Sequence, residues 1–189
     1  MNTVLQFISK ENSKENSNEK NKEESFVDDF EQVFIEQFPL VYNYIFYNVG
    51  NATEAEDLTA DIFVRAFEYW KSFSASKGSR GAWIGGIARN MLKDYYQKKA
   101  NRPQTVELSE FTSSSTDIED DFLLKENLRQ IFDQIDALPE IKRDLITMKY
   151  LLRLNNREIA KIMDMTESNV GVTLHRTIKD MQKKLRKVL

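Results

Sequence analysis

The chain has 189 residues, a formal net charge of −3, six glycines, three prolines, one histidine and no cysteine. This composition excludes disulfides and thiolate-bound zinc, and one histidine is too few for a histidine-based metal site, so we expect no metal and no other cofactor. No apolar run approaches the ~20 residues needed to cross a bilayer, and Met1–Lys10 lacks a basic leader and a cleavage site. We therefore expect a cytoplasmic protein without membrane insertion. Because helix formers dominate the composition, we expect its fold to be all-α.

The charge is divided unevenly along the chain. The first thirty or so residues are predominantly acidic, whereas residues 142–189 carry twelve Lys or Arg side chains against five acidic ones. Such an asymmetry favours a nucleic-acid contact at the basic end. A solvated helical surface without a partner is the alternative interpretation of the same pattern.

The N-terminal part begins with a polar stretch. Residues 1–25 are predicted to form a disordered polar extension, because residues 9–25 contain almost no apolar side chains. From Phe26 onward, apolar residues recur at three- and four-residue steps, which indicates a helix that Pro39 can kink or divide. Val49-Gly50-Asn51 is expected to end this helix.

Two further helices are predicted in the same domain. Thr53 is expected to cap the first of them, with Glu56 as its capping-box partner. The serines and glycines of residues 72–81 indicate a loop, and the following helix is expected over residues 82–99. The sequence therefore predicts a first helical domain over residues 26–100.

A composition change separates this domain from the next. Residues 101–124 contain Pro103, a run of Ser and Thr, and an acidic cluster at residues 117–121. This composition predicts a flexible acidic linker. A second helical domain is expected over residues 125–189, where apolar periodicity is again present.

The second domain contains the pattern of a helix-turn-helix. Leu138-Pro139-Glu140 opens a helix, because proline is well placed in a first helical turn. Asn155 can cap a short second helix with Glu158 reaching back, and Thr166 can cap a long final helix that ends near Val188. A short helix, a tight turn and a helix with basic residues is the geometry that lays one helix in the major groove of DNA.

This motif has two predicted sides. The packed inner side consists of Ile159, Ala160, Met163, Val170 and Leu174. The groove-facing candidates are Glu167, Ser168, Asn169, Gly171, Val172, Thr173, His175 and Arg176. Phosphate contacts, which hold affinity without reading sequence, are expected from Arg176, Lys179, Lys183 and Lys184. An ordinary helical hairpin is the alternative to a DNA-binding motif.

Residues 138–186 contain the letters LPE, EIA and a final HR, together with Arg143. Residues 30–99 contain AEDL and IARN, together with Phe63, Trp70, Trp83-Ile84 and Asp94. Through these motifs and their order the chain resembles the sigma-70 family of RNA polymerase sigma factors, of the extracytoplasmic-function (ECF) type, with region 2 at residues 30–99 and region 4 at residues 138–186. The resemblance implies two small helical domains, sigma region 2 and a helix-turn-helix region 4, joined by the linker.

The resemblance also implies partners and roles. In the family, the helix that carries AEDL docks on core RNA polymerase, which here suggests polymerase-binding roles for Glu56, Asp57, Asp61 and Arg65. The third helix and its preceding loop would contact and melt the −10 element of promoter DNA. An unpaired strand needs aromatic and basic side chains, and these types are supplied by Arg80, Arg89, Asn90, Lys93, Tyr95, Tyr96, Lys98 and Lys99.

The same resemblance implies two sets of residues that contact promoter DNA. For the −10 element they are Ser76, Lys77, Arg80, Arg89, Asn90, Lys93 and Tyr96. For the −35 element they are Ser168, Asn169, Gly171, Val172, Thr173, His175, Arg176 and Lys179. The family often has basic residues where Gly171 and Thr173 stand, so we expect a lightly charged reading face. An anti-sigma factor is a further implied partner.

The resulting hypothesis is an alternative sigma factor that binds core RNA polymerase and directs promoter-specific transcription initiation. A helix-turn-helix regulator that binds duplex DNA without polymerase is the main alternative, and it leaves the AEDL and IARN segments unexplained. A protein-binding helical adaptor leaves the basic end unexplained. We expect no enzyme, because the sequence contains no phosphate-cradling glycine loop, no nucleophile with a histidine base and no cluster of metal ligands.

Overall fold

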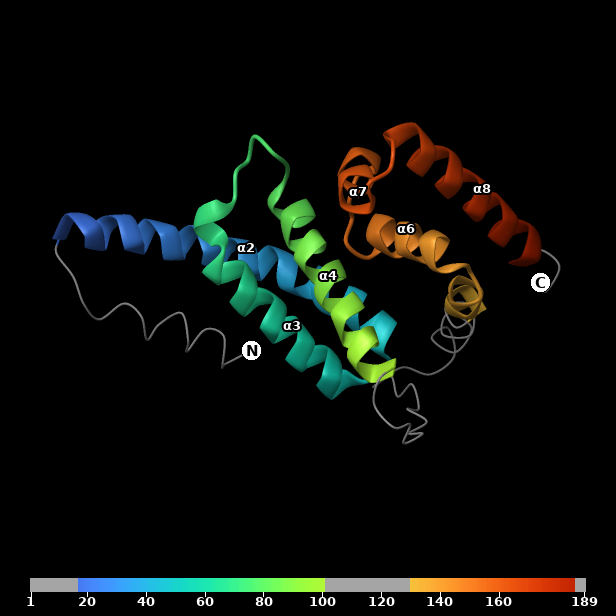
Figure 1. Cartoon of the computed structure of the whole chain (residues 1–189), viewed down its shortest axis with the longest axis horizontal. Coiled ribbons are helices and arrows are strands. Elements are labelled where there is room, and N and C mark those ends of the chain that lie inside the picture. The colour runs from blue at the N-terminus through green and yellow to red at the C-terminus, as the bar shows by residue number, and fades with distance from the viewer. Residues whose placement is uncertain (1–16, 101–129, 186–189) are drawn as a thin grey trace, which may run out of the picture. The chain divides into compact units, whose positions relative to one another are not determined.

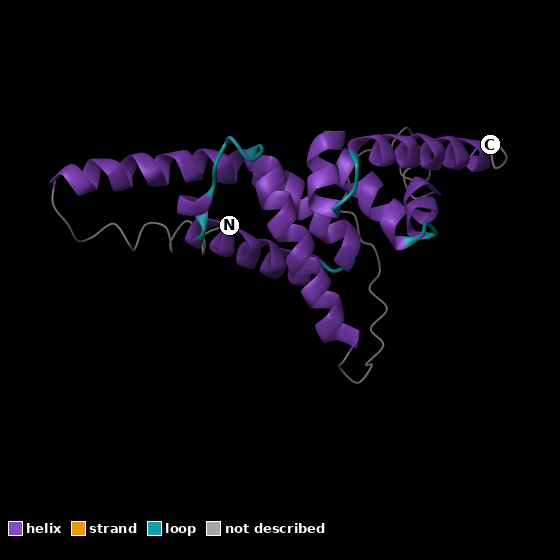
Figure 2. Ribbon diagram, turned by 45° about the horizontal axis from the view of Figure 1, so that its top comes forward, coloured by secondary structure: helices purple, strands orange, loops and turns teal. Residues whose placement is uncertain are grey.

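The computed structural model describes residues 17–100 and 130–185, and the side chains of residues 29–100 and 130–185. The chain divides into two compact units, residues 1–109 and 110–189 (Figure 1). Within the described ranges every regular element is a helix, as the purple ribbons of Figure 2 show. The expected all-α class with two helical domains is therefore confirmed. The predicted linker, residues 101–124, lies outside the described residues.

The N-terminal unit is built from three long helices. They are α2 (Ser17–Val49), α3 (Ala52–Glu68) and α4 (Arg80–Ala100), with a short 3-10 turn, η2 (Trp70–Ser72), between the last two. Each of the three packs against the other two, and α3 and α4 lie side by side in Figure 1. Their interface is rich in aromatic rings, with Phe30, Phe34, Phe63 and Trp70 buried in it. Burial of these large apolar surfaces is the main stabilising contribution in this unit.

Helix α2 differs from the prediction in two respects. It begins at Ser17, so residues 17–25 are helical although we expected them to belong to a disordered extension. The Glu and Lys residues of this stretch are good helix formers, and their lack of an apolar face concealed the helix. The helix also continues through Pro39, so of the two effects expected of this proline, division of the helix does not occur. Pro39 and Ile35 are both exposed, so water can satisfy the Ile35 carbonyl that has no Pro39 N–H to accept from.

The cap of α3 is another difference. Gly50 adopts φ 73° and donates its N–H to the Phe46 carbonyl at 2.9 Å, which ends α2. Asn51 then caps α3, because its side-chain oxygen accepts from the Glu54 N–H at 3.0 Å. The expected cap at Thr53 is therefore wrong. A single residue in the left-handed region lets the next helix begin at once, which leaves Thr53 inside the first turn.

The predicted loop over residues 72–81 is shorter in the structure. The 3-10 turn occupies its start, and α4 begins at Arg80. Ser79 acts as the cap of α4, since its hydroxyl oxygen accepts from the Ala82 N–H at 3.1 Å. The loop between η2 and α4 is therefore residues 73–79.

The C-terminal unit contains α6 (Glu140–Tyr150), α7 (Asn156–Met163) and α8 (Glu167–Leu185), each in contact with the other two. Residues 130–136 form a further helical segment at the edge of the described range. The core combines apolar residues of all three helices with two leucines from the α6–α7 connection: Leu145, Ile146, Met148, Leu152, Leu154, Ile159, Ala160, Val170 and Leu174. Of the predicted inner side, only Met163 is half-buried rather than buried.

Candidate nucleic-acid interface

Helices α7 and α8 each begin at a capping residue, and the turn between them is short. The capping box predicted at the start of α7 is present: the Asn155 side chain accepts from the Glu158 N–H at 3.0 Å, and the Glu158 carboxylate accepts from the Asn155 N–H at 2.8 Å. Asp164 ends α7 with φ 53°, and Thr166 caps α8 by accepting from the Asn169 N–H at 3.2 Å. Two capped helices with a three-residue turn at 164–166 form the helix-turn-helix that the sequence predicted.

Helix α8 has a packed side and an exposed side. Val170, Leu174 and Thr177 are buried, so the helix presents the opposite side to solvent. Six of the eight residues predicted for the −35 element are exposed, namely Ser168, Asn169, Val172, His175, Arg176 and Lys179. This side combines hydrogen-bonding side chains, one exposed apolar group and cations. Such a mixture can contact base edges, thymine methyl groups and phosphates.

The two remaining residues of that set lie on the flanks of α8. Gly171 is half-buried beside α7, where a side chain at this position would meet Asn156 Nδ2 at 3.4 Å. Thr173 is also half-buried, and its hydroxyl donates to the Asn169 side-chain oxygen at 3.3 Å. These two positions, where the family often has basic residues, therefore border the exposed side of α8 rather than occupy its centre.

Arg143 has a structural role that the family motif alone did not reveal. Its guanidinium donates to the carbonyl oxygens of Asp136 and Leu138, the latter at 3.2 Å. These carbonyls lie at and beyond the end of the 130–136 helical segment, where a helix leaves acceptors without backbone partners. Arg143 thus joins that segment to α6. The sequence signal that could have found it is a lone arginine one turn after a proline-capped helix start.

In the N-terminal unit, Arg80 is held on two sides. It forms an ion pair with Asp29 of α2, and its guanidinium lies 5.7 Å from the centre of the Trp70 ring. Trp70 itself packs edge-on against Phe30 at 5.4 Å and stacks on Phe73 at 4.9 Å. The start of α4 is therefore tied to α2 and η2 by a charged and an aromatic contact.

The other −10 candidates separate into two groups. Ser76 and Lys77 are exposed in the loop, where Lys77 N–H donates to the Ser74 carbonyl at 2.9 Å in a tight turn. Arg89, Lys93 and Tyr96 share one side of α4, because they recur at steps of four and three residues, and Asn90 is exposed next to them. Arg80 lies on the other side of α4, facing Asp29 and Trp70. The structure therefore does not bring all seven candidates together.

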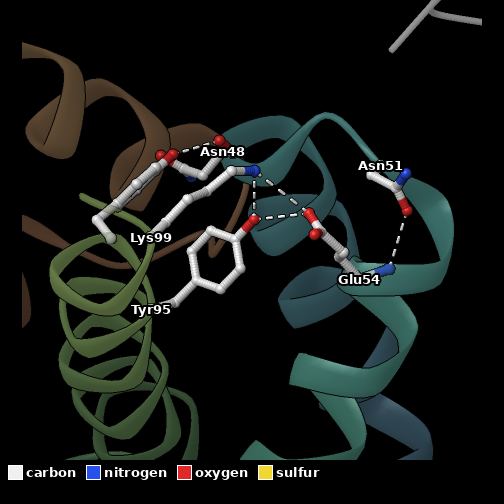
Figure 3. Close-up of polar contacts among 6 residues, drawn as sticks. Asn48, Asn51, Glu54, Tyr95 and Lys99 are labelled. Carbon is white, nitrogen blue, oxygen red and sulfur yellow. Dashed lines mark hydrogen bonds and ion pairs between the residues drawn. The ribbon is translucent and has the colours of Figure 1, made fainter. Parts of the chain in front are cut away.

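The end of α4 is fastened to the α2–α3 turn (Figure 3). The Tyr95 hydroxyl donates to the Glu54 carboxylate at 2.6 Å, and the Lys99 ammonium lies 2.8 Å from the Tyr95 hydroxyl and 3.5 Å from Glu54. The neighbouring Tyr96 hydroxyl donates to the Asn48 carbonyl. Tyr95 and Lys99, which the sequence predicts as strand contacts, both contact Glu54. These contacts hold α4 against the start of α3.

These contacts shift two pKa values upward. Partial burial raises the pKa of Tyr95 above its ordinary 10.0, with the hydrogen bond to Glu54 as the next cause. The hydrogen bond with Tyr95 raises the pKa of Lys99 above 10.5. Both groups therefore hold their protons more tightly in the folded state. The stability that they contribute is present below their unfolded-state pKa values and is lost as the pH rises through the folded-state values.

A Tyr95→Phe variant should therefore show a weaker alkaline loss of stability. We expect the wild-type free energy of unfolding to fall as the pH rises above 10.0, and to fall less steeply in the variant, which lacks the hydroxyl. Urea unfolding across that pH range measures the slope. Tyr69→Phe, which changes an exposed tyrosine of the same unit, is the matched control. Parallel curves for the wild type and Tyr95→Phe would contradict the assignment.

The residues predicted to bind polymerase form a row on α3. Asp57, Asp61 and Arg65 follow one another at four-residue steps and are exposed, whereas Ala55, Thr59, Ile62, Phe63 and Ala66 form the buried side. Glu56 is exposed at the edge of this row. Side chains at such spacing are neighbours on one helical face. Because the exposed side chains of this row are charged, the row is suited to contact a charged surface of a partner protein.

Neither a membrane span nor a metal cluster occurs among the residues that the structure describes. No helix there is long and apolar enough to cross a bilayer. Within the same ranges, no three His, Asp or Glu side chains gather closely enough to hold a metal ion.

Two protein-family models match the chain, one in each unit. Sigma-70 region 2 matches residues 34–102, and Sigma-70 region 4 matches residues 128–181, which together exceed half of the chain. The first match falls within the N-terminal unit and the second within the C-terminal unit. The two regions occur in the order in which AEDL, IARN and the helix-turn-helix occur along the sequence.

Curated relatives match most of this chain. The chain is 27% identical over 160 residues to the ECF RNA polymerase sigma factor BldN of Streptomyces coelicolor, with 84% of this chain and 61% of BldN covered. It is 27% identical over 150 residues to the ECF sigma factor SigX of Bacillus subtilis, covering 76% of each. It is 29% identical over 146 residues to the ECF sigma-E factor of Escherichia coli K12, covering 72% of this chain and 76% of that factor.

Solved structures show the same fold. CnrH, solved in complex with the cytosolic domain of CnrY, matches with a TM-score of 0.61 at 16% identity, covering 84% of this chain and 88% of CnrH. The sigma factor RpoE, solved with the anti-sigma factor NepR from Bartonella quintana, also has a TM-score of 0.61, at 18% identity, covering 84% of this chain and 97% of RpoE. The family matches, the relatives and the fold agree, and the chain belongs to the sigma-70 family as a sigma factor of the ECF type.

Proposed function

We propose that the chain binds core RNA polymerase and directs promoter-specific initiation of transcription. The observation that carries this proposal is the presence of both family regions on two separate helical units. A protein that only bound duplex DNA would need the helix-turn-helix alone. The charged row of α3 then supplies the polymerase contact through Asp57, Asp61 and Arg65, with Glu56 at its edge.

The two units have different tasks in this proposal. The exposed side of α8 contacts the −35 element, with Arg176 and Lys179 on phosphates and Asn169 and Val172 near base edges. The loop at residues 73–79 and the Arg89, Lys93 and Tyr96 side of α4 contact the −10 element. Aromatic and cationic groups side by side suit a separated strand, because they offer stacking surfaces and phosphate partners. In this proposal sigma region 2 extends over residues 26–100 and sigma region 4 over residues 125–189.

Three further points complete it. The chain has no catalytic activity of its own, since polymerase supplies the chemistry. It acts in the cytoplasm, where core polymerase and the chromosome are found in bacteria. An anti-sigma factor is a proposed partner. Support for the last point is the RpoE–NepR complex, in which a protein of the same fold is held by an anti-sigma factor.

Run-off transcription tests the proposal. Purified core polymerase and the full chain, across a library of promoter fragments, should initiate selectively only when both are present. Absence of selective initiation would rule out the sigma function. A tight duplex footprint without polymerase would instead favour the regulator alternative, for which the α7–α8 motif is sufficient.

A charge reversal on α3 sharpens this test. Asp57→Lys with Asp61→Lys should prevent capture by core polymerase and should lower selective initiation in parallel, because both carboxylates are exposed on one face. Glu31→Lys with Glu36→Lys, on the exposed part of α2, is the matched control with the same change of charge. Equal losses from both pairs would contradict a specific α3 contact.

A further inference from the structure

Hydroxyl-bearing side chains form a line along one flank of α8. Thr177, which is 1% exposed, donates its hydroxyl to the Thr173 carbonyl at 2.8 Å. One turn earlier, Thr173 donates its hydroxyl to the Asn169 side-chain oxygen at 3.3 Å. Thr166 accepts from the Asn169 backbone N–H at 3.2 Å. These three bonds connect the buried side of the helix to a side chain at the edge of its exposed side.

Asn169 is consequently held at two points. Its backbone N–H is bound by the Thr166 cap, and its side-chain oxygen is bound by Thr173. Asn169 is exposed, whereas Thr173 is half-buried, so the threonine supports the asparagine from the flank. An asparagine in the first turn of a helix otherwise has nearby backbone donors to turn toward. The bond from Thr173 draws its amide along the helix instead.

We infer that Thr173 is a positioning residue that sets which base edge Asn169 reads, an inference that rests on the proposed −35 contact of α8. Thr173 was expected to read bases itself. With its hydroxyl already bound to Asn169, it acts through that residue. Asn169 is then the group that contacts DNA, because its amide still has the two N–H donors of Nδ2 and one lone pair of Oδ1 without a bond to Thr173.

The bond from Thr173 limits how the Asn169 amide can meet a base edge. An asparagine reads adenine with Oδ1 accepting from N6 and Nδ2 donating to N7, which requires the amide to lie in the plane of the base. The bond from Thr173 uses one of the two lone pairs of Oδ1 and ties the amide plane to the helix. The second lone pair of Oδ1 stays available, so Asn169 can read adenine only where the amide plane held by Thr173 coincides with the plane of the base. The two Nδ2 donors can also bind an acceptor edge, O6 and N7 of guanine or O4 of thymine.

The test compares Thr173→Val and Thr173→Ser in the full chain with core polymerase. Each protein is assayed by run-off transcription on a library in which the −35 element is randomised. Wild type should show a base preference at the base pair that Asn169 contacts. Thr173→Val, which replaces the hydroxyl by a methyl of the same shape, should weaken that preference by roughly fivefold and leave other positions unchanged. Thr173→Ser, which keeps a hydroxyl, should retain it.

A third variant and a stability measurement separate this inference from its alternatives. In an Asn169→Ala background, Thr173→Val should have no further effect on base preference. Thermal unfolding should show that all variants fold as the wild type does. Equal changes in Thr173→Val and Thr173→Ser, or a uniform loss at every base pair, would overturn the positioning role. A wild type without any base preference would overturn the proposed −35 contact as well, so the two failures are distinguishable.

Discussion

Replacement of Phe63 by alanine is expected to lower the free energy of unfolding of the N-terminal unit by about 3–5 kcal/mol. Phe63 has no exposed surface and lies in the centre of α3. Its ring is 4.9 Å from that of Phe34, in an edge-to-face arrangement, and 5.7 Å from that of Phe38. The substitution leaves a cavity between α2 and α3 and removes two aromatic contacts, and both losses destabilise the fold.

Urea denaturation of the full chain measures this effect as a shift of the unfolding midpoint. Ile35→Ala is the matched control, because Ile35 lies on α2 but is 59% exposed and should cost far less. A loss of this size removes a large part of the stability of a small domain. Selective initiation should therefore fall with the folded fraction. Equal costs for the two substitutions would mean that the α2–α3 interface is not the core of this unit.

Removal of two cations from α8 is expected to have the largest effect on DNA binding. Arg176 and Lys179 are both exposed on the side opposite the buried Val170 and Leu174. Loss of one hydrogen bond to a charged group costs about 1.5–3 kcal/mol. The double variant Arg176→Ala, Lys179→Ala should thus weaken promoter binding roughly a hundredfold or more. The loss should be similar for all sequences, because phosphate contacts do not read bases.

The salt dependence identifies the origin of that loss. Each neutralised phosphate contact should reduce the slope of log K against log salt by about one, so the double variant should lose about two. Titration of the holoenzyme against promoter DNA at several salt concentrations gives this slope. Lys161→Ala removes one cation from the exposed surface of α7 and should leave the slope unchanged. An unaltered slope in the double variant would place these two side chains away from phosphate.

Local hydrogen bonding explains which parts of the fold were predictable. The capping box of Asn155 and Glu158 and the Thr166 cap join residues three positions apart, so the pattern of letters already contains both partners. The bond between Thr173 and Asn169 is also local, because it spans one helical turn. The sequence analysis did not predict this bond, because it assigned a separate contact with the −35 element to each of the two residues.

Contacts between helices explain what the pattern missed. Arg80 and Asp29 are separated by 51 positions, and Tyr95 and Glu54 by 41. No periodicity within one helix relates such residues, since the crossing of α2, α3 and α4 decides which of them meet. Arg80 consequently faces Asp29 and Trp70, and only Arg89, Lys93 and Tyr96 share a side of α4.

The sequence by itself determined the helical class, the two-domain order and the helix-turn-helix, because apolar spacing and capping residues act over one or two turns. It also placed most of the exposed side of α8 correctly. Only the tertiary structure decided that Asn51 rather than Thr53 begins α3, that Arg143 joins α6 to the preceding segment, and that Tyr95 and Lys99 bind Glu54. These outcomes depend on which surfaces the packed helices bring together, and that information is not local to any stretch of the chain.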